Sequence, residues 1–231
     1  MFLPNREINL RDARSYNVTH HKRSILMNQL YSNYQSLLGK AQLFDGLAPL
    51  LLRLYLAPVF IQAGWTKWQS FDATVMWFGD KEWGLGMPFP ELMVTLAMSA
   101  EIVGGALLLL GLMTRLVAIP LMFTMAVAAI TAHWQNGWLA LADSNSWFAD
   151  GTLFYNESIM AAAEKKQRAI EILQEYGNYE WLSSSGSFTI LNNGIEFAAT
   201  YFIMTLVLFF TGGGRFTSVD YFVKLKIERT E

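Results

Sequence analysis

The chain has 231 residues, of which 53% are hydrophobic and only 16% are charged, and its mean hydropathy is +0.25. This composition is typical of a membrane protein, and no basic face or glycine-rich phosphate loop indicates a nucleic-acid-binding or nucleotide-binding protein. The formal net charge is −2, and cysteine is absent, which excludes disulfides, thiol chemistry and thiolate metal sites.

Residues 1–46 are expected to form a cytoplasmic tail and an interfacial helix. Residues 1–22 are polar and mixed in charge, which favours a disordered tail over a signal peptide. From Leu26 to Ala41, apolar residues recur at steps of three and four, as they do on one face of a helix. We expect this helix to lie along the inner membrane surface, and a soluble helix that binds a partner is the alternative.

Four apolar stretches predict a membrane domain over residues 47–221. The uninterrupted apolar run from about residue 92 to 133 is too long for one span, because a helix rises about 1.5 Å per residue and the hydrocarbon core is about 30 Å thick. Gly, Thr and Arg at positions 111–115 break it into two helices joined by a tight turn. The fold class predicted is all-α, an antiparallel four-helix transmembrane bundle. The four predicted spans are residues 47–66, 92–111, 115–134 and 191–210.

Two loops between these spans differ in character. Residues 71–90 are rich in aromatics, glycine and proline, and are expected to form an ordered hydrophobic loop against the membrane face. Residues 135–190 form an inserted outer loop that contains a soluble helix at residues 157–176. Residues 222–231 are expected to be a cytoplasmic tail.

Orientation follows from the lysines and arginines, which concentrate on the cytoplasmic side of membrane proteins. With both termini inside, twelve of the 17 lie on the inner side and five on the outer side. All eight tryptophans then fall on the outer side. An interfacial anchor is one interpretation of this distribution, and a binding surface is the other. The prediction is a multi-pass inner-membrane protein with both termini in the cytoplasm.

Two of the ionisable residues in the predicted spans, Arg53 and Glu101, lie well away from the span ends, and a charge at mid-bilayer costs about 2.5–3.5 kcal/mol. Arg53 either snorkels to the inner phosphates or forms a structural ion pair. Glu101 lies near the middle of its span and is too deep to snorkel, so it is protonated or paired inside the bundle. A structural hydrogen bond and a proton-handling or ligand-binding role both remain open for it.

Three further groups lie near the outer boundary at a depth close to that of Glu101. Helical side chains lean toward the N-terminus, so those of Lys67 and His133 lean into the membrane, whereas those of Glu101 and Glu196 lean outward. These four residues are the candidate catalytic residues of one outer-half site. No metal site is predicted, since one imidazole and two carboxylates lack helical i,i+4 spacing. The candidate cofactor-binding residues are the neighbouring tryptophans Trp65, Trp68 and Trp134.

Several motifs resemble the DoxX family of small four-helix membrane proteins, over about residues 47–135 and 191–221. They are Arg53, Gly64 with Lys67, Glu101-x-x-Gly-Gly with the following Leu-Gly-Leu-x-Thr-Arg115, Asn and Gly before Glu196, and the glycine-rich stop followed by Ser218 and Asp220. The family pattern has a much shorter third loop. The longer form looks like DoxX-type proteins encoded beside iron-dependent enzymes that modify copper-binding peptides.

The resemblance implies an association with membrane redox chemistry in a bacterial inner membrane, since some relatives are small subunits of quinone-linked oxidoreductases. The first hypothesis is therefore a subunit of a membrane redox or quinone-linked system, with a quinone as the cofactor. Whether the chain itself is an enzyme stays open, because without cysteine or paired histidines the electrons need a bound quinone or a protein partner. The alternative is a non-catalytic membrane component that assists maturation or export of a modified copper-binding peptide. A transporter comes third, because the small bundle lacks inverted repeats.

Overall fold

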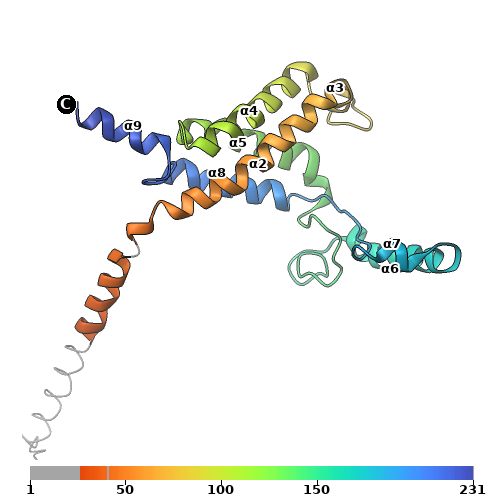
Figure 1. The fold of residues 1–231 in the computed structure, drawn as a ribbon. Coiled ribbons are helices and arrows are strands. Elements are labelled where there is room, and N and C mark those ends of the chain that lie inside the picture. Colours follow the sequence, from red (N-terminus) through yellow and green to blue (C-terminus); the bar gives the residue numbers. More distant parts are fainter. Residues whose placement is uncertain (1–26, 41, 231) are drawn as a thin grey trace, which may run out of the picture. The chain divides into compact units, whose positions relative to one another are not determined.

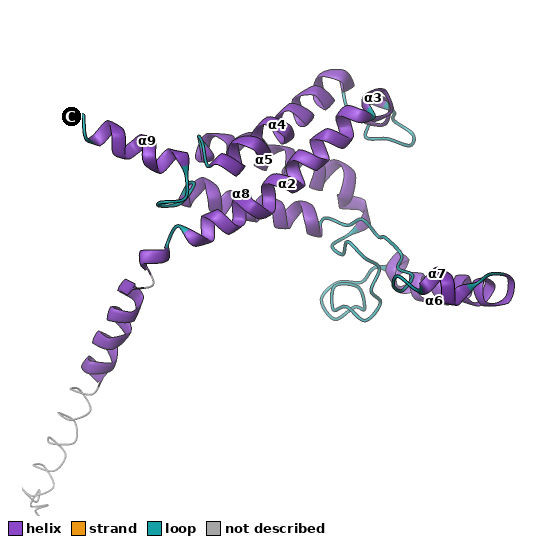
Figure 2. Cartoon of the chain, in the orientation of Figure 1, coloured by secondary structure: helices purple, strands orange, loops and turns teal. Residues whose placement is uncertain are grey.

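The structure is a computed structural model that describes residues 27–40 and 42–230. These residues form helices and loops and no β-strand, so the all-α class predicted from the sequence is confirmed for them (Figure 2). The chain divides into two compact units, Met1–Gly46 and Leu47–Glu231, and each is described here by itself.

In the first unit, residues 27–40 are helical and a 3-10 turn, η1, follows at Gln42–Phe44. The apolar side chains of this helix, among them Leu30, Tyr34 and Leu37, are exposed. The helix therefore has the apolar stripe that its sequence predicts. The predicted tail at residues 1–22, and the ends of the stripe at Leu26 and Ala41, lie outside the described residues.

The second unit contains three helices that are long and apolar enough to cross a membrane. They are α2 (Leu47–Gln69), α4 (Pro90–Leu110) and a continuous helix over Thr114–Asn136, and they correspond to the first three predicted spans. The third consists of α5 (Thr114–Ala128), a π-helical turn η2 (Ala129–His133) and a 3-10 turn η3 (Trp134–Asn136).

The fourth predicted span is shorter than expected, because α8 covers only Glu196–Thr211. The prediction that residues 191–195 are helical is wrong. Their backbone instead pairs with residues 137–140. The N–H groups of Asn192 and Gly194 donate to the carbonyls of Ala140 and Leu139, each at 3.0 Å. Asn193 has a φ of 60°, a left-handed conformation that asparagine tolerates and that interrupts a helix.

The remaining helices lie between or after these. They are α3 (Phe71–Gly79), α6 (Glu157–Tyr176), α7 (Tyr179–Ser183) and α9 (Val219–Glu228). Helix α6 has the bounds read from the sequence, and Asn156 caps it by accepting the N–H of Ile159 at 3.2 Å. Helix α3 lies within the stretch that was predicted to be only a loop, and α9 includes most of the predicted C-terminal tail.

Helix α2 packs on α4, α5 packs on both α4 and α8, and α2 also contacts α8 (Figure 1). Two glycines bring the backbones of α2 and α4 together. A Cβ on Gly105 would lie 2.7 Å from Cγ1 of Ile61, and one on Gly64 would lie 2.7 Å from Cγ1 of Ile102. This close approach, typical of small residues between membrane helices, brings the C-terminal half of α2 against the middle of α4.

Candidate functional site

The end of the unit at which α2 begins is held together by Arg53, whose side chain is fully buried. Its Nη1 donates to the carbonyls of Leu108 and Leu109, each at 3.2 Å, and its Nη2 donates to the Thr217 carbonyl at 2.7 Å. Arg53 therefore binds carbonyls in the last turn of α4, where the intrahelical hydrogen bonds end, and the Leu108 carbonyl also accepts the N–H of Gly111 at 3.0 Å. Snorkelling to lipid phosphates is excluded by its burial, and these contacts are to carbonyls rather than to an acid.

Other motif residues complete the same structure, here called the inner-end joint: Arg53, Gly111, Ser218 and Asp220. The Asp220 carboxylate accepts the N–H groups of Met113 at 2.6 Å and Thr114 at 2.9 Å, where α5 begins. Gly111 has a φ of 66°, and a Cβ there would lie 2.6 Å from that of Ser218. These residues join α2, α4, α5 and α9, and their role is structural.

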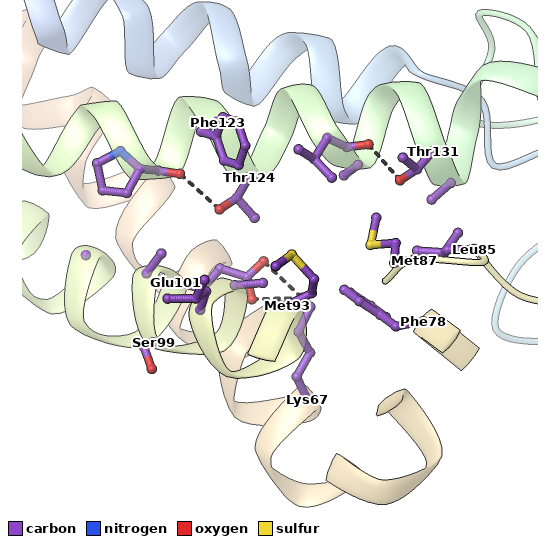
Figure 3. Close-up of a pocket in the computed structure, with 18 of the residues that line it drawn as sticks. Lys67, Phe78, Leu85, Met87, Met93, Ser99, Glu101, Phe123, Thr124 and Thr131 are labelled. Atoms are coloured by element: carbon purple, nitrogen blue, oxygen red, sulfur yellow. Dashed lines mark hydrogen bonds and ion pairs between the residues drawn. The ribbon is translucent and has the colours of Figure 1, made fainter. Parts of the chain in front are cut away.

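In the other half of α2, Lys67 forms an ion pair with Glu101 (Figure 3). Nζ of Lys67 donates to the two carboxylate oxygens of Glu101 at 2.7 and 2.9 Å. The side chain of Glu101 is only 2% exposed, whereas that of Lys67 is 24% exposed. The acid thus has the internal partner that its depth requires, because a buried charge is stable only when it is paired.

The Lys67–Glu101 pair lies at the wall of a cavity between α4 and α5, here called the groove, with a volume of about 960 Å³. Most of its lining is aliphatic or aromatic, including Phe78, Met87 and Phe123. Its volume falls within the roughly 300–1,000 Å³ of small-molecule sites, which are mostly apolar with a few polar groups.

Two threonines that line the groove do not add free donors to it. The Thr124 hydroxyl donates to the Pro120 carbonyl at 2.9 Å, and the Thr131 hydroxyl donates to the Val127 carbonyl at 2.7 Å (Figure 3). Both bonds stay within their own helix. The ionisable groups among the lining residues are Lys67, Glu101 and His133.

His133 ends the π-helical turn η2 and also lines the groove. Its Nδ1 lies 2.9 Å from the Asn193 carbonyl oxygen. Because a carbonyl only accepts, this bond requires a proton on Nδ1, and in the neutral ring Nε2 is then an acceptor. π-helical turns are frequent at functional sites, and this one turns His133 toward the 191–195 segment.

Glu196 is not among the residues that line the groove, so of the four predicted site residues the structure brings together Lys67, Glu101 and His133. Oε2 of Glu196 accepts the backbone N–H of Ala140 at 2.9 Å. The sequence prediction placed Glu196 inside the fourth span, whereas Glu196 is the first residue of α8. Its side chain is bonded to residues 137–140, the segment that pairs with residues 192–195.

The predicted cofactor-binding tryptophans are also absent from the lining of the groove. Trp65, Trp68 and Trp134 are 52%, 60% and 67% exposed. Trp77 of α3 lines the groove instead, as does Leu85 from the loop after α3. These residues were missed because residues 71–90 were predicted to be an ordered hydrophobic loop against the membrane face, whereas Phe71–Gly79 forms a helix. Among the described residues, no group of three or more His, Cys, Asp and Glu could hold a metal ion.

The three long apolar helices define a helical membrane protein, and the groove is a largely apolar cavity between two of these helices. The DoxX family model matches residues 48–134, which contain α2, α3, α4, α5, the π-helical turn η2 and the groove. The chain is therefore similar to the DoxX family over residues 48–134, and the resemblance read from the motifs is confirmed there.

Two curated relatives match parts of the chain. The Bacillus subtilis (strain 168) protein named "Putative oxidoreductase CatD" is 33% identical over 82 residues, which are 36% of this chain and 57% of the relative. The Escherichia coli (strain K12) protein named "Inner membrane protein YphA" is 33% identical over 95 residues, which are 39% of this chain and 65% of the relative. The chain thus spans less than two thirds of either relative. No solved structure matches it.

Proposed function

We propose that this protein is a subunit of a membrane redox system and that the groove binds a quinone. The observation that carries the proposal is the Lys67–Glu101 ion pair at the wall of a largely apolar cavity of about 960 Å³. The apolar walls suit an isoprenoid tail, and the exposed part of Lys67 suits a headgroup carbonyl. The name of the Bacillus subtilis relative, which contains the word oxidoreductase, also supports it.

A bound quinone would supply two-electron, two-proton redox chemistry. The residues of this chain would position it and manage protons. Lys67 has three N–H groups, and two of them are engaged by Glu101. The third N–H makes only a long hydrogen bond to the Ala63 carbonyl at 3.5 Å, so it is available to donate to a headgroup oxygen. Glu101 keeps the ammonium in place, and Nε2 of His133 accepts a proton at the groove.

The electrons are proposed to come from a protein partner, because the chain has no cysteine and only three histidines. Two of these, His20 and His21, are adjacent and lie outside the described residues. The chain is then a quinone-binding subunit of a complex rather than a self-sufficient enzyme. A quinone extracted in stoichiometric amount from the protein purified with its native lipids would support this function, and an empty groove under those conditions would contradict it.

A second candidate function is a non-catalytic membrane component for maturation or export of a modified copper-binding peptide. The observation that favours it is the aromatic surface of the outer segment, where Trp147, Phe154 and Tyr155 are 66%, 62% and 68% exposed. This surface would be the docking site for a peptide or its modifying enzyme. A change confined to the groove should leave such a function intact, which separates the two candidates.

The proposed topology is a four-helix antiparallel bundle in which α8 is the fourth span. Helix α8 has 16 residues, about 24 Å, which is somewhat shorter than the roughly 30 Å of a hydrocarbon core. Reporter fusions after Lys40 and Leu112 should be cytoplasmic, and a fusion within α6 after Lys166 should lie outside. A cytoplasmic reporter at Lys166, or an external one at Leu112, would contradict this topology.

A further inference from the structure

Helix α9 has an apolar face that is exposed in the second unit. Val219, Phe222, Val223 and Ile227 recur at helical spacing and are 39%, 57%, 47% and 55% exposed. The side chain of Tyr221 on the opposite side is half-buried, and its ring lies 4.9 Å from that of Phe216. One face of α9 therefore packs on the protein, and the apolar face has no covering among the described residues of this unit.

The position of α9 is fixed by the inner-end joint. Ser218 caps the helix by accepting the N–H of Tyr221 at 3.3 Å, and the backbone N–H of Asp220 donates to the Gly111 carbonyl at 3.0 Å. The Asp220 carboxylate binds the first N–H groups of α5. Helix α9 thus starts beside the turn at which the membrane-capable helix α4 ends and the membrane-capable helix over Thr114–Asn136 begins (Figure 1). That turn is a membrane boundary, because a hydrocarbon core extends no further than the apolar helices.

The charges on α9 fit an anionic surface. Lys224 and Lys226 are exposed, and Arg229 directly follows the helix. Lys226 lies among the exposed apolar residues, where its four-carbon stem covers apolar surface while its ammonium reaches outward. Of the two acids of α9, Asp220 caps α5, and Glu228 pairs with Lys224 at 3.6 Å.

We propose that α9 lies in the plane of the membrane interface, with its apolar face in the acyl region and its lysines on the phosphates of anionic phospholipids. Exposed apolar residues together with basic residues on one helix are the pattern of such interfacial helices. The inner-end joint attaches the start of α9 to the turn between α4 and α5, which lies at the membrane boundary. The inference is independent of the groove and of its ligand.

The absence of cysteine allows a direct test by single-cysteine spin labelling of the full chain in lipid nanodiscs. Labels at Phe222→Cys and Ile227→Cys are expected to be accessible to oxygen and protected from a water-soluble nickel relaxant. A label at Glu228→Cys, on the polar side, is the matched control and should show the reverse. Equal exposure of all three labels to the nickel relaxant would overturn the proposal. Labels at positions 222 and 227 that are protected from both oxygen and nickel would also overturn it, because they would lie against protein and not in the acyl region.

The preference for anionic lipid is tested separately with the Lys224→Gln/Lys226→Gln variant. Native mass spectrometry should show that the parent protein retains phosphatidylglycerol in preference to phosphatidylcholine. In the variant, the retention of phosphatidylglycerol should fall by about fivefold for each lysine removed. The control is Lys165→Gln/Lys166→Gln on α6, which should retain lipid as the parent does. Equal retention of both lipids by the parent protein would overturn the electrostatic part of the proposal.

Discussion

Arg53→Met is expected to lower the free energy of unfolding by about 3–5 kcal/mol, because it leaves carbonyls of Leu108, Leu109 and Thr217 without their buried donor. A methionine also fills less of the fully buried volume that the guanidinium occupies. The measurement is the loss of helical circular dichroism during titration of the detergent-solubilised protein with sodium dodecyl sulfate.

Two controls accompany this variant. Arg53→Lys should recover only part of the loss, because a single ammonium does not reach three carbonyls as a planar guanidinium does. Arg229→Met removes an exposed arginine next to α9 and should unfold like the parent. If Arg53→Met unfolded at the same denaturant fraction as Arg229→Met, the inner-end joint would have no structural role.

Lys67→Met is expected to destabilise the protein by on the order of 3 kcal/mol, because it leaves the Glu101 carboxylate buried without a partner. Adding Glu101→Leu should restore most of that stability, because the double variant buries no charge. Glu101→Gln alone should be tolerated better than Lys67→Met, since an amide oxygen still accepts from Lys67.

The same unfolding titration, applied to the parent, Lys67→Met, Glu101→Leu and the double variant, gives a double-mutant cycle. A coupling energy near zero between positions 67 and 101 would contradict a stabilising ion pair. A double variant that is stable but no longer binds the groove ligand would separate the structural role of the pair from its proposed role in binding.

The parts of this structure that the sequence predicts are those set by long apolar runs and by the cost of buried charge. Glu101 lies too deep in its span to reach water, so a partner was required. Lys67 was a candidate partner, because its side chain on an antiparallel helix leans into the membrane while that of Glu101 leans outward. The break of the long apolar run at Gly111 follows from the same kind of argument. Each inference depends only on helix length, helix rise and side-chain direction.

The parts that the sequence does not predict depend on backbone hydrogen bonds between distant segments. Glu196 was expected in the site because the fourth span was predicted to begin at residue 191, yet the backbone of residues 192–195 pairs with residues 137–140. Arg53 was expected to meet lipid or an acid, because the unpaired carbonyls of another helix are invisible in a linear sequence. The walls of the groove were missed where α3 contributes to them.

The central claim, that the groove binds a quinone, is tested most directly by quantifying quinone extracted from purified variants in native-lipid nanodiscs. Ala100→Phe adds an aromatic ring to the groove wall, whereas Leu109→Phe, on the same helix and 45% exposed, lies outside the lining and is the matched control. We expect about one quinone per chain in the parent and in Leu109→Phe, and at least a tenfold loss in Ala100→Phe at unchanged stability. Equal quinone content in Ala100→Phe and Leu109→Phe, or none in the parent, would contradict the proposed function.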